Sequence, residues 1–237
     1  MSVATKTISA APPSPSRLGI LWGSSVGKKF LMALTGILLS LFVLGHLLGN
    51  AQLYLPKDST GAWAINLYAK FLHNNVPLLW GTRIVMGISV LVHAIAGIQL
   101  YLAKQSARPI AYHEKQSVNS TLSSRTMIWS GLLIGGFVVY PLLHLTVGSA
   151  HPDFVPLDVM HNVTTGLRGL AAVFYVIGMV ALGFHLRHGL YSLFSSLGAG
   201  NPAISKSVYN YAAVVATLIA LANISFPLAV IAGLVRG

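Results

Sequence analysis

Histidine is the residue type through which this chain could bind a metal-containing group, because cysteine is absent. Without cysteine the chain can form no disulfide, no thiolate metal site and no iron–sulfur cluster of its own. Nine histidines are present, and several stand in strongly apolar stretches: His46, His93, His144 and His185, with His188 three residues after the last. An imidazole in such surroundings costs free energy unless it is bonded, so we interpret these residues as functional.

The apolar stretches around these histidines are long enough to cross a membrane. The chain is 54% hydrophobic and 8% charged, with a mean hydropathy of +0.72, which exceeds what a soluble domain needs. A helical span requires about 20 apolar residues. Five segments have this length, at 29–55, 78–103, 127–149, 168–193 and 208–235. We therefore predict an all-α membrane protein whose residues 28–237 form a bundle of five transmembrane helices.

The first 27 residues are expected to form a cytoplasmic tail. Proline and serine dominate them, and they lack the apolar core of a cleaved signal. For residues 18–29, a segment along the membrane interface and a disordered lead-in are both open. With the first helix starting inside, ten of the fifteen Lys and Arg residues fall on the cytoplasmic side. The positive-inside rule then predicts a cytoplasmic N-terminus and an outer C-terminus.

The charge of the chain indicates its partners. The net charge of +11 is explained by this bias together with anionic lipid or an acidic partner. No basic stripe on a soluble face is present, which argues against nucleic acid. The four acidic residues fall in predicted loops, which argues against paired-carboxylate catalysis inside the membrane. Four further histidines fall in polar connections and are expected to be solvated: His73, His113, His151 and His161.

The depths of the four intramembrane histidines predict how they pair. A helix rises ~1.5 Å per residue, so His46 and His144 lie ~26 Å from the inner surface. The second and fourth segments run the other way, which places His93 and His185 ~22 to 26 Å from the outer surface. The rings therefore form an outer and an inner pair, ~15 to 20 Å apart. One metal ion cannot bind all four, because its ligands must lie within ~2 Å of it.

Two facing imidazoles at each depth suit two hemes with two axial histidines each. Glycines on the same segments leave room for a flat ring, although small residues also allow membrane helices to pack closely. They are Gly36, Gly45, Gly87, Gly97, Gly131, Gly135, Gly136, Gly178 and Gly183. Pro141, three residues before His144, is expected to free a backbone carbonyl and kink the third helix.

Several blocks resemble the five-helix diheme cytochrome b subunit of bacterial succinate:quinone oxidoreductases. They are SSVGKKFLMALTGILLSLFVLGHLLGNAQLYL, PLLWGTRIVMGISVLVHAIAGIQL, ARPIAY, SSRTMIWSGLLIGGFVVYPLLHLTVG and GFHLRHGLYSLFSSLG. The resemblance implies that His46 and His144 are the axial ligands of one heme b, and His93 and His185 those of the other. His188 then lies near a propionate or the membrane interface.

The resemblance also implies the chemistry of succinate dehydrogenase in a bacterial cytoplasmic membrane. A flavoprotein subunit oxidises succinate, and an iron–sulfur subunit carries electrons to the membrane. This chain then passes them through two hemes b to or from a quinone, for which menaquinone is expected. The expected quinone contacts are Ser25, Lys28 and Lys29, beside Ser24. An alternative quinone site lies around Asn50 and Gln52.

Two other classes remain open. Another transmembrane diheme cytochrome b, such as an ascorbate-driven reductase, also has four histidines on four helices, but it acts without flavin and iron–sulfur partners. A membrane protein without heme would use the buried histidines as a proton relay. Co-purification of flavin and iron–sulfur subunits would distinguish a succinate dehydrogenase from the first class. The b-type bands of a reduced-minus-oxidised spectrum would distinguish it from the second.

Overall fold

The computed structural model describes residues 16–107, 126–196 and 202–237, and these ranges are mainly helical. Residues 1–15 of the expected tail and His113 lie outside them. The elements in chain order are α1 (Arg17–Gly23), α2 (Ser25–Asn50), η1 (Ala51–Tyr54), α3 (Ala64–Asn74), α4 (Val76–Ser106), α6 (Met127–Pro141), η2 (Leu142–Val147), α7 (Val159–Gly166), α8 (Gly169–Ser196) and α9 (Pro202–Ile231).

Within the described ranges, five helical segments are long and apolar enough to cross a membrane. They are Ser25–Tyr54, Val76–Ser106, Met127–Val147, Gly169–Phe194 and Ser205–Ile231. Large apolar side chains on them are exposed, for example Leu48 at 64% and Leu91 at 62%, as expected of helices that face lipid. The predicted all-α membrane fold with five spans is therefore confirmed, and the chain is a multi-pass membrane protein.

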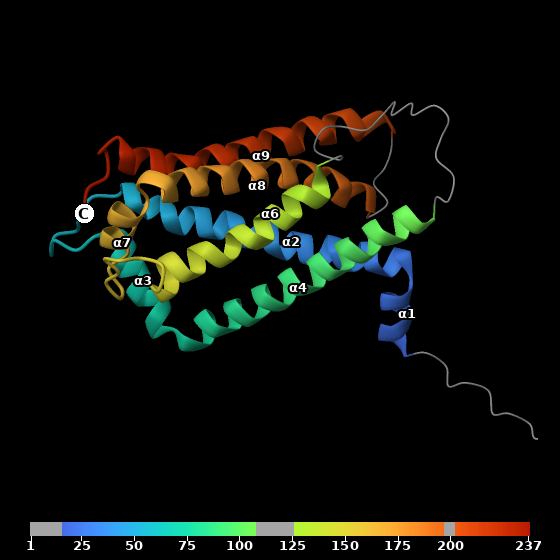
Figure 1. The fold of residues 1–237 in the computed structure, drawn as a ribbon, viewed down its shortest axis with the longest axis horizontal. Coiled ribbons are helices and arrows are strands. Elements are labelled where there is room, and N and C mark those ends of the chain that lie inside the picture. Colours follow the sequence, from blue (N-terminus) through green and yellow to red (C-terminus); the bar gives the residue numbers. More distant parts are fainter. Residues whose placement is uncertain (1–15, 108–125, 197–201) are drawn as a thin grey trace, which may run out of the picture.

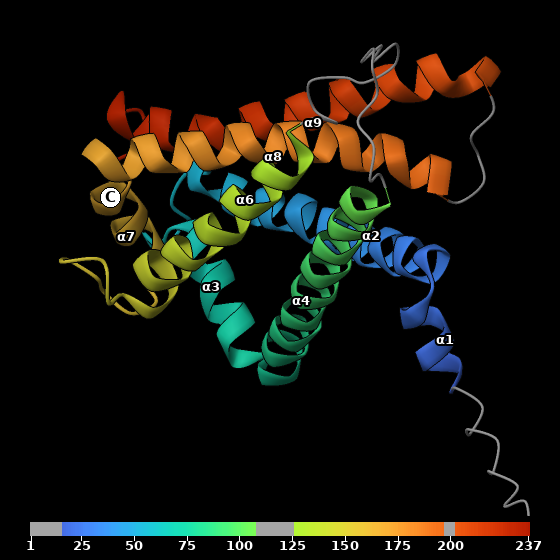
Figure 2. The same cartoon turned by 45° about the vertical axis from the view of Figure 1, so that its right-hand side comes forward.

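Four of the five spans form a bundle, and α9 packs against its outside. α2 packs along α4, α6 packs along α8, and further contacts join α2 to α8 and α4 to α6. α9 packs mainly on α8, and successive spans run in opposite directions (Figures 1 and 2). The four bundle helices are those that carry His46, His93, His144 and His185. The histidines therefore lie on the helices that surround the bundle interior.

α1 lies at one end of the bundle, while α3, α7 and the C-terminus lie at the other (Figure 1). We call these the α1 end and the α7 end. Residues 17–23, for which a disordered lead-in was one possibility, are helical. α2 begins at Ser25 because the Ser24 hydroxyl accepts a hydrogen bond from the Gly27 amide at 2.9 Å, which is an ordinary helix cap.

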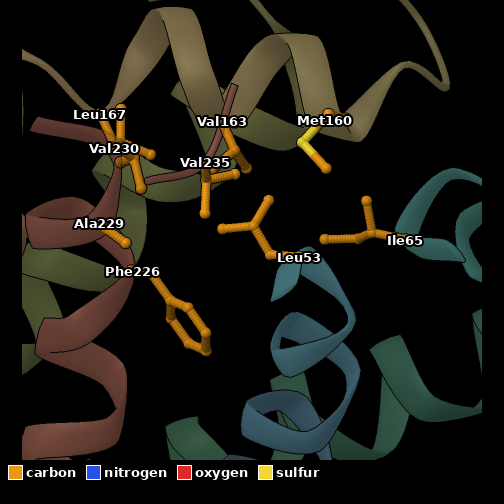
Figure 3. Close-up of a cluster of buried hydrophobic side chains, with 9 residues drawn as sticks. All are labelled: Leu53, Ile65, Met160, Val163, Leu167, Phe226, Ala229, Val230 and Val235. Carbon is orange, nitrogen blue, oxygen red and sulfur yellow. The ribbon is translucent and has the colours of Figure 1, made fainter. Parts of the chain in front are cut away.

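The α7 end holds a cluster of buried apolar side chains, shown in Figure 3. The cluster joins η1, α3, α7 and the last turns of α9. Its members are Leu53, Ile65, Met160, Val163, Leu167, Phe226, Ala229, Val230 and Val235. The short helices α3 and α7 are thus fixed across the ends of the spans.

The third span changes its helix type just before its histidine. α6 ends at Pro141, and the chain continues as the π-helix η2, which carries His144. Proline has no N–H to donate to the preceding turn, so a regular α-helix is interrupted there. A kink was expected at Pro141, and the structure shows a change from α- to π-helix there, a feature that often occurs at functional sites.

Candidate functional site

His93 on α4 and His185 on α8 lie next to each other inside the bundle. Their ring centroids are 6.2 Å apart, and the ring planes are inclined by 60°. Both side chains are half-buried. α4 and α8 are the second and fourth spans and run in the same direction, and the neighbouring positions of the rings agree with the depths calculated from helix rise.

A hydroxyl group on α2 lies within hydrogen-bond distance of His93. Thr35 Oγ1 lies 3.1 Å from His93 Nδ1 and donates its hydrogen to the carbonyl of Leu31 at 2.7 Å. A hydroxyl has one hydrogen, and when that hydrogen is bonded to a carbonyl of its own helix, the oxygen is left to accept from an imidazole N–H. The hydrogen-bond pattern therefore assigns the proton of His93 to Nδ1 and leaves Nε2 with a free lone pair.

The same arrangement occurs at His185. Ser130 Oγ on α6 lies 3.2 Å from His185 Nδ1, and its hydroxyl donates to the carbonyl of Met127 at 3.0 Å. His185 is thereby assigned the same tautomer, with Nε2 unprotonated. With this assignment, Nε2 of both rings is unprotonated, which is the form of imidazole nitrogen that can bind a metal.

Glycines make room for the two rings. A Cβ added to Gly36 would lie 3.4 Å from His93 Cε1, and one added to Gly131 would lie 3.3 Å from His185 Cε1. These contacts are tighter than most real Cβ contacts. A side chain at either glycine would push on the neighbouring imidazole.

The inner pair fits the axial ligands of a heme iron. A bond from a metal to an imidazole nitrogen is about 2 Å long and the ring centroid lies ~1 Å behind that nitrogen, so two rings on opposite sides of one ion have centroids ~6 Å apart. The 6.2 Å between His93 and His185 matches this separation. In the described ranges no group of three or more His, Cys, Asp or Glu side chains that could hold a metal ion occurs, so a pair is the largest set there. The ligand role of the pair stays a prediction.

The structure does not bring His46 and His144 together in the same way. His46 is exposed and stacks on Phe42 of its own helix, with centroids 5.5 Å apart. Among the described residues no ring contact joins His46 to His144. The outer pair therefore does not show the geometry of the inner one, and a heme shared by His46 and His144 stays an expectation from their depths and from the resemblance.

His144 is enclosed by aromatic rings. It is 3% exposed and stacks between Tyr140, at a centroid distance of 5.0 Å, and His151, at 4.9 Å. Its Nδ1 lies 3.3 Å from the hydroxyl of Tyr175. The site around His144 is thus built from α6, η2, the following loop and α8.

The prediction that His151 is solvated is wrong. Its side chain is 5% exposed, Nε2 lies 3.0 Å from the carbonyl of Asn162, and Nδ1 accepts from the Asp153 amide at 3.1 Å. Through these bonds the ring joins the two ends of the loop between η2 and α7, and the loop buries it. Both nitrogens are engaged, so His151 has no free lone pair for a metal.

The other loop histidines differ among themselves. His161 is half-buried, with Nε2 3.0 Å from the carbonyl of Asp153, so it too is more enclosed than expected. His73 at the end of α3 is exposed, as predicted. The sequence carries no local signal for the enclosure of His151 and His161. Their hydrogen-bond partners are backbone carbonyls, whose positions depend on how the loop folds.

The residues expected to contact quinone lie at the start of α2. Ser25 and Lys29 are exposed and Lys28 is half-buried. In the part of the chain that the structure describes, the Ser25 hydroxyl has no hydrogen-bond partner, whereas Ser24 caps the helix. Ser25 is ten residues from Thr35 on the same helix, so it lies ~15 Å along the axis from the inner pair.

The glycines of the spans serve two purposes. A Cβ on Gly178 would collide with the ring of Phe137, and one on Gly183 would lie 3.1 Å from Ala220 Cβ, so both allow close helix packing. Open space adjoins Gly45, Gly87, Gly135 and Gly136.

A membrane-spanning helical bundle with a facing histidine pair in its interior is typical of a membrane cytochrome b. A comparison with protein-family models identifies the family of the chain. The model described as the succinate dehydrogenase/fumarate reductase transmembrane subunit matches residues 104–225, more than half of the chain. The chain belongs to this family. Searches of curated proteins and of solved structures found no match.

Proposed function

We propose that the chain is the membrane-anchor cytochrome b subunit of a succinate dehydrogenase that passes electrons from an iron–sulfur subunit to a membrane quinone, menaquinone. The observation that carries this proposal is the inner pair: rings 6.2 Å apart, each with Nδ1 against a hydroxyl. His93 and His185 hold one heme b through their unprotonated Nε2 atoms. A bound heme supplies one-electron transfer.

The chain contributes ligation, orientation and a dry environment to this chemistry. α4 and α8 supply the two ligands, while Thr35 on α2 and Ser130 on α6 fix the orientation of the rings. The four helices exclude water from the space between them, which lowers the local dielectric constant. These are the properties through which a protein sets the potential of a heme.

A second heme b belongs to the outer pair in this proposal. His46 and His144 would be its axial ligands, and the support comes from the resemblance and from their similar depth. The enclosed position of His144 is compatible with a ligand inside the bundle.

The partners follow from the residues that the chain lacks. It has no cysteine, so any iron–sulfur cluster must be held by another subunit, and succinate is oxidised on a flavoprotein subunit. We place both partners at the α1 end, on the cytoplasmic side of a bacterial cytoplasmic membrane, with the C-terminus outside. The Ser25 hydroxyl binds a quinone carbonyl there, and Lys28 and Lys29 supply charge.

The test is to purify the tagged chain from membranes and record its reduced-minus-oxidised spectrum. We expect b-type bands with two components, co-purified flavoprotein and iron–sulfur subunits, and succinate-dependent quinone reduction. Bands of b type without those partners would favour an ascorbate-driven type of reductase. A spectrum without b-type bands would favour a proton relay and contradict the proposal.

A further inference from the structure

The hydroxyl groups of Thr35 and Ser130 contact the inner histidines from two different helices. We propose that Thr35 and Ser130 are positioning residues that hold His93 and His185 in the tautomer and orientation needed to bind heme iron. This inference rests on the proposed function. Neither residue touches the iron, and each acts through the imidazole next to it.

Burial gives these hydrogen bonds their strength. The side chains of Thr35 and Ser130 are each 7% exposed. In such a setting the loss of a hydrogen bond to an imidazole N–H is costly, and the backbone carbonyls of Met32 and Met127 are the other acceptors beside these rings. Because each hydroxyl hydrogen is directed to a carbonyl of its own helix, the oxygen remains as the acceptor for Nδ1–H.

The arrangement is built twice, by two separate helix pairs. In both, a hydroxyl residue is followed directly by a glycine: Thr35 by Gly36 on α2, and Ser130 by Gly131 on α6. The hydroxyl binds Nδ1 and the glycine makes room for Cε1 of the histidine on the partner helix. α2 pairs with α4 in one case and α6 with α8 in the other. The same contacts thus recur at both sides of one candidate ligand pair.

A hydrogen bond from Nδ1–H to an acceptor makes the imidazole a more basic ligand and fixes its ring plane. A more basic ligand stabilises the oxidised iron and lowers the midpoint potential. Loss of the acceptor should therefore raise the midpoint potential of the inner heme. It should also weaken heme binding, by about 10-fold or more, as is typical when the partner of a ligand is removed.

The experiment compares hydroxyl-deleting and hydroxyl-keeping variants in the complete membrane complex. Thr35→Val and Ser130→Ala remove the acceptor, while Thr35→Ser and Ser130→Thr keep it. Ser192→Ala is a matched control, because the Ser192 hydroxyl also donates to a carbonyl three residues earlier but has no hydrogen bond to a histidine among the described residues. Redox titration of the b-type bands and low-temperature electron paramagnetic resonance spectra are recorded for each variant. Artificial-dye succinate activity verifies assembly of the complex.

We expect both deletions to raise the potential of the same component and shift its resonance signal, while the hydroxyl-keeping variants and Ser192→Ala match the wild type. Wild-type potentials and signals in both Thr35→Val and Ser130→Ala would overturn the positioning role and leave the proposed function standing. If the complexes with Thr35→Val and Ser130→Ala both fail to assemble, the test uses Thr35→Ser and Ser130→Thr. These variants keep the hydroxyl, so a shifted midpoint potential in them would overturn the inference. Absence of b-type bands in the wild type would instead overturn the proposed function.

Discussion

His151 and His144 stack with ring centroids 4.9 Å apart and planes inclined by 24°. His151 belongs to the loop after η2, and its nitrogens bond the backbone at Asn162 and Asp153. The loop is thereby held against the ring of His144, the expected ligand of the outer heme. Gly166 lies against both rings, because a Cβ there would fall 2.7 Å from His151 Nε2 and 2.9 Å from His144 Cε1.

Replacement of His151 should therefore disturb the outer heme and spare the inner one. His151→Ala removes the stacking partner and the two hydrogen bonds that join the ring to the backbone at Asn162 and Asp153, each of which contributes about 1 kcal/mol. We expect a shifted or lost outer component in the reduced-minus-oxidised spectrum. His73→Ala, at an exposed position, is the control and should leave the spectrum unchanged. A change confined to the inner component would show that the contact has another role.

The turn after η1 should depend on pH through Asp58. Its carboxylate accepts hydrogen bonds from the Thr60 hydroxyl at 2.7 Å and from the amides of Thr60 and Ala62 at 2.8 and 3.0 Å. The bond from the Thr60 side chain is the main cause that lowers the pKa of Asp58 below its ordinary value of 3.8. A lowered folded-state pKa means that the stabilisation is complete above the ordinary value and is lost as the pH falls through the lowered one.

Hydrogen exchange of the Thr60 and Ala62 amides tests this dependence. The intact chain should protect them more than Asp58→Asn at neutral pH, and the difference should disappear in acid. Comparison at each pH removes the intrinsic pH dependence of exchange. Equal protection in both chains at neutral pH would contradict the prediction.

The five spans could be predicted from hydropathy because lipid selects for long apolar segments. The predicted segment 78–103 corresponds to Val76–Ser106, and 127–149 to Met127–Val147. Hydropathy does not fix how each helix is rotated about its axis. The contacts of Thr35 and Ser130 with the histidines were therefore found only in the structure.

The short helices and the buried loop histidine at the α7 end were not predicted from the sequence. α7 has eight residues, and Met160 in its first turn is buried by other elements rather than by a long apolar repeat. The burial of His151 likewise depends on a carbonyl eleven residues away. Such contacts come from tertiary packing, which local patterns do not encode.

The quinone proposal predicts a specific loss in Ser25→Ala. If the hydroxyl bonds a quinone carbonyl, its removal should weaken quinone reduction by roughly 10-fold, the equivalent of one hydrogen bond of about 1.4 kcal/mol. Both hemes and the artificial-dye activity of the soluble subunits should remain intact. Ser25→Thr keeps the hydroxyl and serves as the matched control. Unchanged quinone kinetics in Ser25→Ala would remove this residue from the site.

The pairing of the four histidines is tested most directly by the reduced-minus-oxidised spectra of four single variants. His93→Ala and His185→Ala should remove or alter the same b-type component, and His46→Ala and His144→Ala should share the other. The inner variants should also lose more electron delivery from succinate, because their heme lies nearer the donor subunit. If His93→Ala and His46→Ala instead remove the same component, the pairing is contradicted. The 6.2 Å contact between His93 and His185 would then not be a ligand pair.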